Sequence, residues 1–196
     1  NEVKENNPYL GLRGLARELR DEHMLRLEFE AIKEAIKEGY DNLGVIFPLV
    51  RDIKEYHQAK EILHSVGLTP HQDLKVGVVF ETPSACLQIN EFINSGIDLA
   101  FIGINDITQY TLASDRTNNE MSHLYNPLHP SVIYLVKHVL TACKKARIET
   151  TMNFLPPLKK IFPELINCGL SSVTLQAQQI HSISKVLSEL ETNGSV

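Results

Sequence analysis

Two short apolar segments, each ending in a carboxylate, most constrain what this chain can fold into. Residues 78–85 read Val-Val-Phe-Glu-Thr-Pro-Ser-Ala, and residues 101–112 read Phe-Ile-Gly-Ile-Asn-Asp-Ile-Thr-Gln-Tyr-Thr-Leu. Apolar runs of strand length between helical segments are typical of parallel sheets, whose strands are buried on both faces. In a barrel of alternating strands and helices, the carboxyl ends of the strands build the active site. We therefore expect Glu81 and Asp106 to converge at one edge of the sheet, where paired carboxylates indicate a hard divalent cation.

The rest of the chain alternates in the same way. Apolar residues at helical spacing predict helices over 15–38, 52–66, 83–94, 131–146, 156–168 and 178–190, with Asp52 and Ser131 as N-caps. Apolar runs predict strands over 43–50, 74–80, 99–104, 148–154 and 172–175, with a sixth at 10–12 if that segment pairs. This order predicts parallel strands joined by right-handed crossovers. The polar stretch 114–126 is long enough to form a lid or binding loop.

The strand count falls short of a closed barrel. A closed (βα)8 barrel needs eight strands and typically about 250 residues, whereas this chain has 196 residues. Either the sheet is open, or the chain is the later part of a barrel whose first strands lie upstream of Asn1. With 43% hydrophobic residues the chain can bury a core, and we expect a single domain over residues 1–196.

Composition argues against several classes of function. The net charge of -5, with scattered Lys and Arg, gives no basic stripe for nucleic acid. No apolar stretch approaches the roughly 20 residues that cross a bilayer, and the polar first seven residues are unlike a secretion signal. Cys86, Cys143 and Cys168 are widely spaced and indicate neither a disulfide framework nor a zinc site. We expect a cytoplasmic protein without nucleic-acid or membrane partners.

Separated motifs, taken together and in order, resemble a known family. They are Asn-Pro-Tyr-Leu-Gly-Leu-Arg-Gly at 7–14, Glu-Thr-Pro-Ser-Ala at 81–85, Gly-Ile-Asn-Asp-Ile-Thr-Gln-Tyr-Thr-Leu at 103–112, and Asp-Arg at 115–116. The chain resembles the C-terminal substrate-binding domain of the phosphoenolpyruvate (PEP)-utilising enzymes from residue 7 to about residue 176. Residues 28–33 and 47–51 also resemble the PEP synthase branch of that family.

The resemblance implies a TIM-type (βα)8 barrel of the phosphoenolpyruvate/pyruvate superfamily, here without its first strands. It implies that Glu81 and Asp106 hold Mg²⁺, that Arg13 and Arg116 bind phosphate, and that Asn105 contacts the substrate. Arg51, at the carboxyl end of an expected strand, and Gly103 complete the candidate substrate-binding residues. These residue types suit the chemistry, because Mg²⁺ prefers carboxylate and water oxygens and arginine grips a phosphoryl group bidentately.

The implied activity is Mg-assisted phosphoryl transfer between a phosphohistidine and pyruvate, but one expected group is missing. Family members place a cysteine in a Gly-Cys-Gly context at the end of the seventh strand, where it exchanges a proton with the enolate methyl carbon. Residues 150–154 read Thr-Thr-Met-Asn-Phe, so Met152 or Asn153 takes that place. Neither side chain can exchange a proton in that role. Ile104 also replaces the small polar residue usual before Asn105. We therefore assign no catalytic residue and expect the isolated chain to be inactive.

Three hypotheses about function remain. The first is the PEP/pyruvate-binding domain of a PEP synthase-like phosphotransferase, whose partner is a phosphohistidine domain upstream. The second is a non-catalytic ligand-binding or assembly module that keeps the metal site. The third is a carbon-carbon lyase of the aldolase and citrate lyase type, against which the motifs at 7–14 and 108–116 speak. Exposed edges of an incomplete sheet also predict a homodimer.

Overall fold

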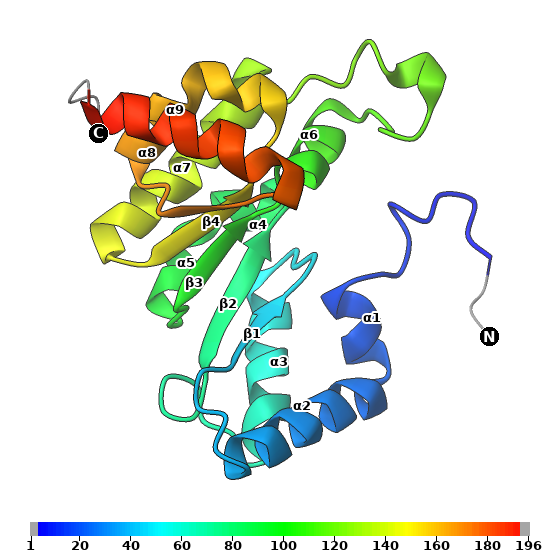
Figure 1. Ribbon diagram of the computed structural model, residues 1–196. Coiled ribbons are helices and arrows are strands. Elements are labelled where there is room, and N and C mark those ends of the chain that lie inside the picture. The colour runs from blue at the N-terminus through cyan, green and yellow to red at the C-terminus, as the bar shows by residue number, and fades with distance from the viewer. Residues whose placement is uncertain (1–3, 193–196) are drawn as a thin grey trace.

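A five-stranded parallel sheet lies at the centre of the computed structural model, which describes residues 4–192, with side chains to residue 188. The strands are β1 (Gly44–Phe47), β2 (Lys75–Phe80), β3 (Leu99–Ile102), β4 (Glu149–Asn153) and β5 (Ser172–Thr174). They pair in the order β1-β2-β3-β4-β5, each parallel to the next (Figure 1). The prediction of parallel strands is confirmed. Residues 10–12 add no sixth strand, because Leu10 lies in a turn whose backbone N–H groups bond back to Asn7 and Pro8.

Helices precede the sheet and connect its strands. They are α1 (Leu15–Arg20), α2 (Glu22–Lys37), α3 (Ile53–Ser65), α4 (Pro83–Leu87), α5 (Ile89–Asn94), α6 (Ile104–Leu112), α7 (Pro130–Ala146), α8 (Phe162–Cys168) and α9 (Ile180–Thr192). Short 3-10 turns occupy Asn119–Met121, Pro156–Ile161 and Ala177–Gln179. Figure 1 shows α1 to α3 gathered near β1, and α7 to α9 near β4. None of the helices in the described residues is long and apolar enough to cross a bilayer.

Two helices expected to be continuous are broken, for local reasons. Asp21 separates α1 from α2, because its backbone is extended and its side chain accepts a hydrogen bond from the His23 N–H as an N-cap. Gln88 separates α4 from α5, with ψ at 12°. Its side-chain oxygen accepts from the Ile53 N–H at 3.3 Å, which ties the break to the start of α3.

Other helix boundaries also differ from expectation. The N-cap of α7 is His129 rather than Ser131, because the His129 ring accepts a hydrogen bond from the Ser131 N–H. The Pro156–Pro157 segment starts a 3-10 turn, and the α-helix begins only at Phe162. Helix α6 begins immediately after β3, within the motif that follows Gly103.

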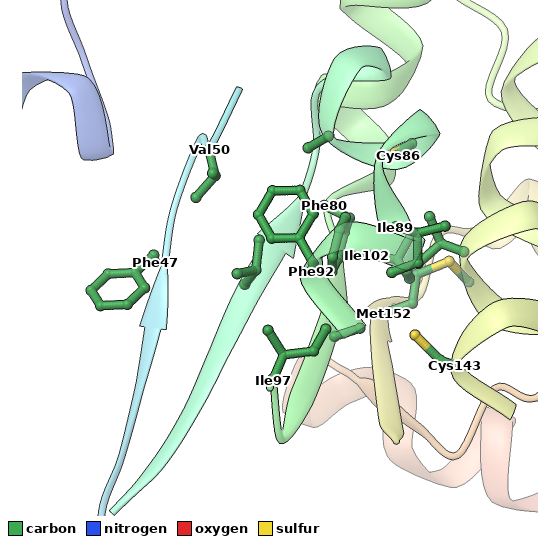
Figure 2. Close-up of a cluster of buried hydrophobic side chains, with 14 of the residues drawn as sticks. Phe47, Val50, Phe80, Cys86, Ile89, Phe92, Ile97, Ile102, Cys143 and Met152 are labelled. Atoms are coloured by element: carbon green, nitrogen blue, oxygen red, sulfur yellow. The ribbon is translucent and has the colours of Figure 1, made fainter. Parts of the chain in front are cut away.

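Alternate residues of each strand divide the sheet into a buried face and a more open one. The buried face packs against the helices and comprises Phe47, Val76, Val78, Phe80, Ala100, Ile102, Thr150 and Met152. Figure 2 shows part of the hydrophobic core between this face and the helices, in which Met152 lies near Cys143 of α7 and Ile89 of α5. The opposite face, here called the open face, carries Ile46, Val79, Leu99, Phe101 and Thr151, none of which is fully buried. The carboxyl edge of this open face holds the candidate site.

A chain of aromatic rings joins the helices to the first two strands. Phe29 of α2 meets Phe47 of β1, Phe47 meets Tyr56 of α3, Tyr56 meets Phe92 of α5, and Phe92 meets Phe80 of β2. The centroid distances run from 5.3 to 6.2 Å, most of them at edge-to-face angles. Such pairs contribute about 0.5–1.5 kcal/mol each beyond buried area, so the ends of β1 and β2 next to the site are firmly held.

Candidate functional site

Glu81 is the first residue after β2, and the backbone of Leu49 holds it in place. The Leu49 N–H donates a hydrogen bond of 2.6 Å to Oε1 of Glu81. Leu49 follows β1 with a φ of 48°, a left-handed conformation that is uncommon for a leucine. Strained backbone of this kind persists where the surrounding structure over-determines it, often at functional sites. Here it turns an N–H group toward the carboxylate.

Gly103 makes room for the Glu81 side chain. It follows β3, and its N–H donates to the Phe80 carbonyl at 3.0 Å. A Cβ atom on Gly103 would lie 2.5 Å from Cβ of Glu81 and 2.8 Å from its Oε2. Any larger residue would therefore displace the carboxylate.

Asp106 lies in the first turn of α6 and forms an ion pair with Arg116. The Asp106 N–H donates to the Gly103 carbonyl at 3.1 Å, which closes that first turn. Nη1 of Arg116 donates to Oδ2 of Asp106 at 3.0 Å. The helix start itself favours negative charge. With 29% of the Arg116 side chain and 15% of the Asp106 side chain exposed, the pair is largely shielded from water.

The environment of Glu81 shows that these charges converge. The pKa of Glu81 is raised to about 7, mainly by burial and in part by the negative charge of Asp106. The Leu49 N–H opposes the shift, as do the positive charges of Arg13 and Arg116. The site therefore holds a carboxyl group whose negative charge is poorly neutralised by its surroundings.

The carboxylates of Glu81 and Asp106 fit a Mg²⁺ ion whose other ligands are water and substrate oxygens. No group of three or more His, Cys, Asp or Glu side chains that could hold a metal occurs in the described part of the chain. Mg²⁺ is usually bound by one or two carboxylates and keeps waters and substrate oxygens as its other ligands. Glu81 and Asp106 match that pattern. A cation would also supply the positive charge that the Glu81 environment lacks.

The three candidate arginines lie around the same edge. Arg13 and Arg116 both contact the ring of Tyr9, with Cζ 5.0 and 5.4 Å from its centroid. Arg51 donates to the Leu49 carbonyl at 3.4 Å and lies 3.8 Å from a carboxylate oxygen of Glu55. A cavity of about 130 Å³ opens beside Arg51, and its lining is Tyr9, Leu10, Leu49, Arg51, Thr82 and Tyr110.

Asn105 is held by the loop that follows α6. Its Oδ1 accepts a hydrogen bond of 3.0 Å from the Tyr125 hydroxyl. Tyr125 lies in the polar stretch 114–126, which extends away from the sheet in Figure 1. Arg116 lies in the same stretch, so this loop contacts two of the candidate residues.

The comparison with protein families decides what kind of domain carries this site. The family model described as "PEP-utilising enzyme, PEP-binding domain" matches residues 1–192. The chain belongs to the PEP-utilising enzymes, as their PEP-binding domain. The resemblance inferred from the sequence motifs is thus confirmed.

Curated relatives of this PEP-binding domain are longer proteins. The chain is 40% identical over 194 residues to the probable phosphoenolpyruvate synthase of Pyrococcus abyssi, covering 97% of this chain and 23% of that protein. It is 32% identical over 197 residues to the phosphoenolpyruvate-protein phosphotransferase of Latilactobacillus sakei, covering 96% of this chain and 34% of that protein. The PEP-binding domain therefore spans about a quarter to a third of the length of these relatives.

Solved structures support the barrel-type fold. An aldolase/citrate lyase family protein from Burkholderia cenocepacia matches with a TM-score of 0.54 at 16% identity, covering 83% of this chain and 70% of that one. At this identity the likeness concerns the fold alone. The open parallel sheet of the PEP-binding domain is consistent with part of a (βα) barrel, as the sequence predicts.

The structure separates the two residues expected at the missing cysteine position. Met152 is fully buried and pairs with Ile102 within the helix-covered core. Asn153 is the next residue, so its side chain leaves β4 on the open face, at the same carboxyl edge as Glu81. Asn153 is therefore the residue that can face a ligand.

Two contributors to the site were not identified from the sequence. Leu49 acts through its backbone, and a leucine carries no local signal for a left-handed conformation. Tyr9 belongs to the motif at 7–14, and its ring contacts both Arg13 and Arg116. A contact that joins residues about a hundred positions apart leaves no trace in local spacing.

Proposed function

We propose that this domain binds PEP and pyruvate and forms the phosphoryl-accepting and phosphoryl-donating part of a PEP synthase-like phosphotransferase. In the proposed reaction a phosphoryl group moves between a phosphohistidine and the enolate oxygen of pyruvate. The observation that carries the proposal is the convergence of two carboxylates and two arginines at the carboxyl edge of the sheet. Family membership supports the same assignment.

Each side chain has a distinct task in this proposal. Glu81 and Asp106 would hold Mg²⁺, which supplies positive charge to the oxygens that become negative during transfer. Arg13 and Arg116 bind and orient the phosphoryl group, and they remain charged at every working pH. Asn105 orients the three-carbon acid by hydrogen bonding. Arg51 adds a further positive charge to the lining of the adjoining cavity.

Proton exchange at the enolate carbon is the step that this chain supports least. Asn153, at the expected cysteine position, has an amide that neither gives nor takes a proton at useful rates. This observation favours a second candidate function, a ligand-binding module that retains the site without turnover. Replacing Asn153 by cysteine in the full-length protein distinguishes the two: gained turnover identifies an impaired transferase, and unchanged binding without turnover identifies the module.

Calorimetry tests ligand binding directly. Oxalate, which resembles the enolate of pyruvate, is titrated into the protein with and without Mg²⁺, and PEP is titrated in parallel. Glu81→Gln and Asp106→Asn are each expected to weaken Mg-dependent oxalate binding at least about tenfold, because each removes one charged ligand of the cation. Glu61→Gln, an exposed change on α3, is the matched control. Absence of binding by the unaltered protein, or full binding by Glu81→Gln, overturns the proposal.

The proposed partners follow from the same assignment. A phosphohistidine domain must reach the carboxyl edge of the sheet to exchange its phosphoryl group. A second copy of the domain is proposed to cover an open edge of the sheet. We also propose a cytoplasmic location, which the free thiols Cys86, Cys143 and Cys168 support, because disulfides are rare in reducing compartments.

A further inference from the structure

The aromatic ring of Tyr9 lies close to two guanidinium groups. Cζ of Arg13 is 5.0 Å from the ring centroid, and Cζ of Arg116 is 5.4 Å from it. Arg13 lies in the segment before α1, whereas Arg116 lies in the loop after α6. One side chain thus contacts two cations that come from segments far apart in the sequence.

Two neighbouring guanidinium groups repel each other, and negative charge close to both of them offsets that repulsion. An aromatic ring does so, because its face carries partial negative charge and attracts a cation within about 6 Å. The Tyr9 ring, within 5.0 and 5.4 Å of the two Cζ atoms, therefore offsets part of the repulsion between Arg13 and Arg116.

Tyr9 is itself fixed on its backbone side. The Tyr110 hydroxyl donates a hydrogen bond of 2.7 Å to the Tyr9 carbonyl, which ties the N-terminal segment to α6. Tyr9 also lines two cavities, the one of about 130 Å³ beside Arg51 and another of about 190 Å³ beside Gln109 and Ser114.

We propose that Tyr9 is a positioning residue that holds Arg13 and Arg116 together so that both can contact one phosphoryl group. This inference rests on the proposed function. It predicts selectivity between ligands, since Tyr9 would strengthen binding of a phosphorylated acid and leave its unphosphorylated counterpart unaffected.

The test compares PEP with oxalate on the full chain in the presence of Mg²⁺. Tyr9→Leu removes the ring but keeps an apolar side chain, and it is expected to weaken PEP binding about tenfold through the loss of two cation–π contacts. Oxalate binding is expected to stay within about twofold, because oxalate has no phosphoryl group. Tyr9→Phe keeps the ring face and is expected to retain PEP affinity within about threefold. Tyr134→Leu, at an exposed tyrosine of α7, is the matched control.

A double-mutant cycle shows whether the ring acts through the arginines. In an Arg13→Gln and Arg116→Gln background, Tyr9→Leu is expected to have no further effect on PEP affinity. Equal loss of oxalate and PEP in Tyr9→Leu, equal weakening by Tyr9→Phe, or an undiminished effect in the Gln background each overturns the positioning role. Failure of the unaltered protein to bind either ligand instead overturns the proposed function with it.

Discussion

At the residue scale, Glu81 is a carboxyl group whose protonation is coupled to folding. Burial raises its pKa from the usual 4.5 to about 7, so between these values the folded protein holds a proton that the unfolded chain releases. The stability that this proton contributes is fully present below about pH 4.5 and is lost as pH rises through about 7. A cation that replaces the proton removes this loss.

The pH dependence of stability measures that coupling. Without added metal, the urea midpoint of the unaltered protein is expected to fall from pH 5 to pH 8 relative to that of Glu81→Gln, since glutamine has no proton to lose. Added Mg²⁺ is expected to raise the midpoint most at pH 8. Parallel curves for the two proteins across this range contradict the raised pKa.

Adding a single carbon atom at Gly103 would displace the Glu81 side chain. Gly103→Ala places a methyl group 2.5 Å from Cβ of Glu81, an atom too close to the backbone to move away cheaply. We expect unfolding free energy to fall by about 1–3 kcal/mol and Mg-dependent oxalate binding to be lost. The comparison variant is Gly44→Ala, whose nearest neighbour would be the Lys75 carbonyl oxygen at 3.2 Å. Similar oxalate affinities for both variants would show that Glu81 is not held in this way.

The candidate residues differ in how readily their sequence reveals them. Glu81 and Asp106 were predictable because each follows an apolar strand, and carboxyl ends of parallel strands share one edge. The choice between Met152 and Asn153 needed the register of β4, which decides the face of the sheet for each residue. The left-handed backbone of Leu49 was not predictable, because the neighbouring structure rather than the residue type imposes it.

At the element scale, polar caps decide where the helices begin. Oδ1 of Asp52 accepts a hydrogen bond of 2.7 Å from the Lys54 N–H and thereby caps α3. Asp52→Ala is expected to lower the free energy of unfolding by about 1 kcal/mol in urea titrations. Asp41→Ala, at an exposed aspartate before β1, is the control. A loss no larger than that of the control would mean that the cap contributes nothing.

Hydrophobic periodicity predicts where a helix lies better than it predicts whether the helix is interrupted. Helix α7 runs over Pro130–Ala146, close to the expected 131–146, because its apolar stripe is long and regular. The breaks at Asp21 and Gln88 arise from side chains that bond to backbone groups, one of them from another helix. The Asp21 cap is local and the Gln88 contact is tertiary, and neither shows in helix periodicity.

At the scale of the whole molecule, the open sheet leaves β1 and β5 each with a single described neighbour. Ile46 of β1 is 38% exposed on the open face. We expect concentration-dependent association in sedimentation experiments, because unpaired strand edges are templates for pairing. Ile46→Lys is expected to weaken this association, whereas Leu87→Lys, an exposed change on α4, is not. A monomer at high concentration, or dissociation by Leu87→Lys alone, contradicts association through this edge.

The number and direction of the strands could be predicted from the sequence. Whether the sheet closes into a barrel could not. Five apolar runs separated by helices imply parallel strands. The same five runs fit an open sheet or part of a closed barrel equally well, since closure depends on the full set of strands. The pairing pattern shows five strands without closure among the described residues, which is consistent with part of a (βα) barrel.

The uninterrupted strand order has a consequence for how the protein is made. Each strand from β2 to β5 is hydrogen bonded to the one that precedes it in the chain. Each new strand could therefore pair with the sheet as it leaves the ribosome, because its partner strand has already been synthesised. Pulse-labelled hydrogen exchange on stalled chains should find β1 and β2 protected before β4 has been synthesised.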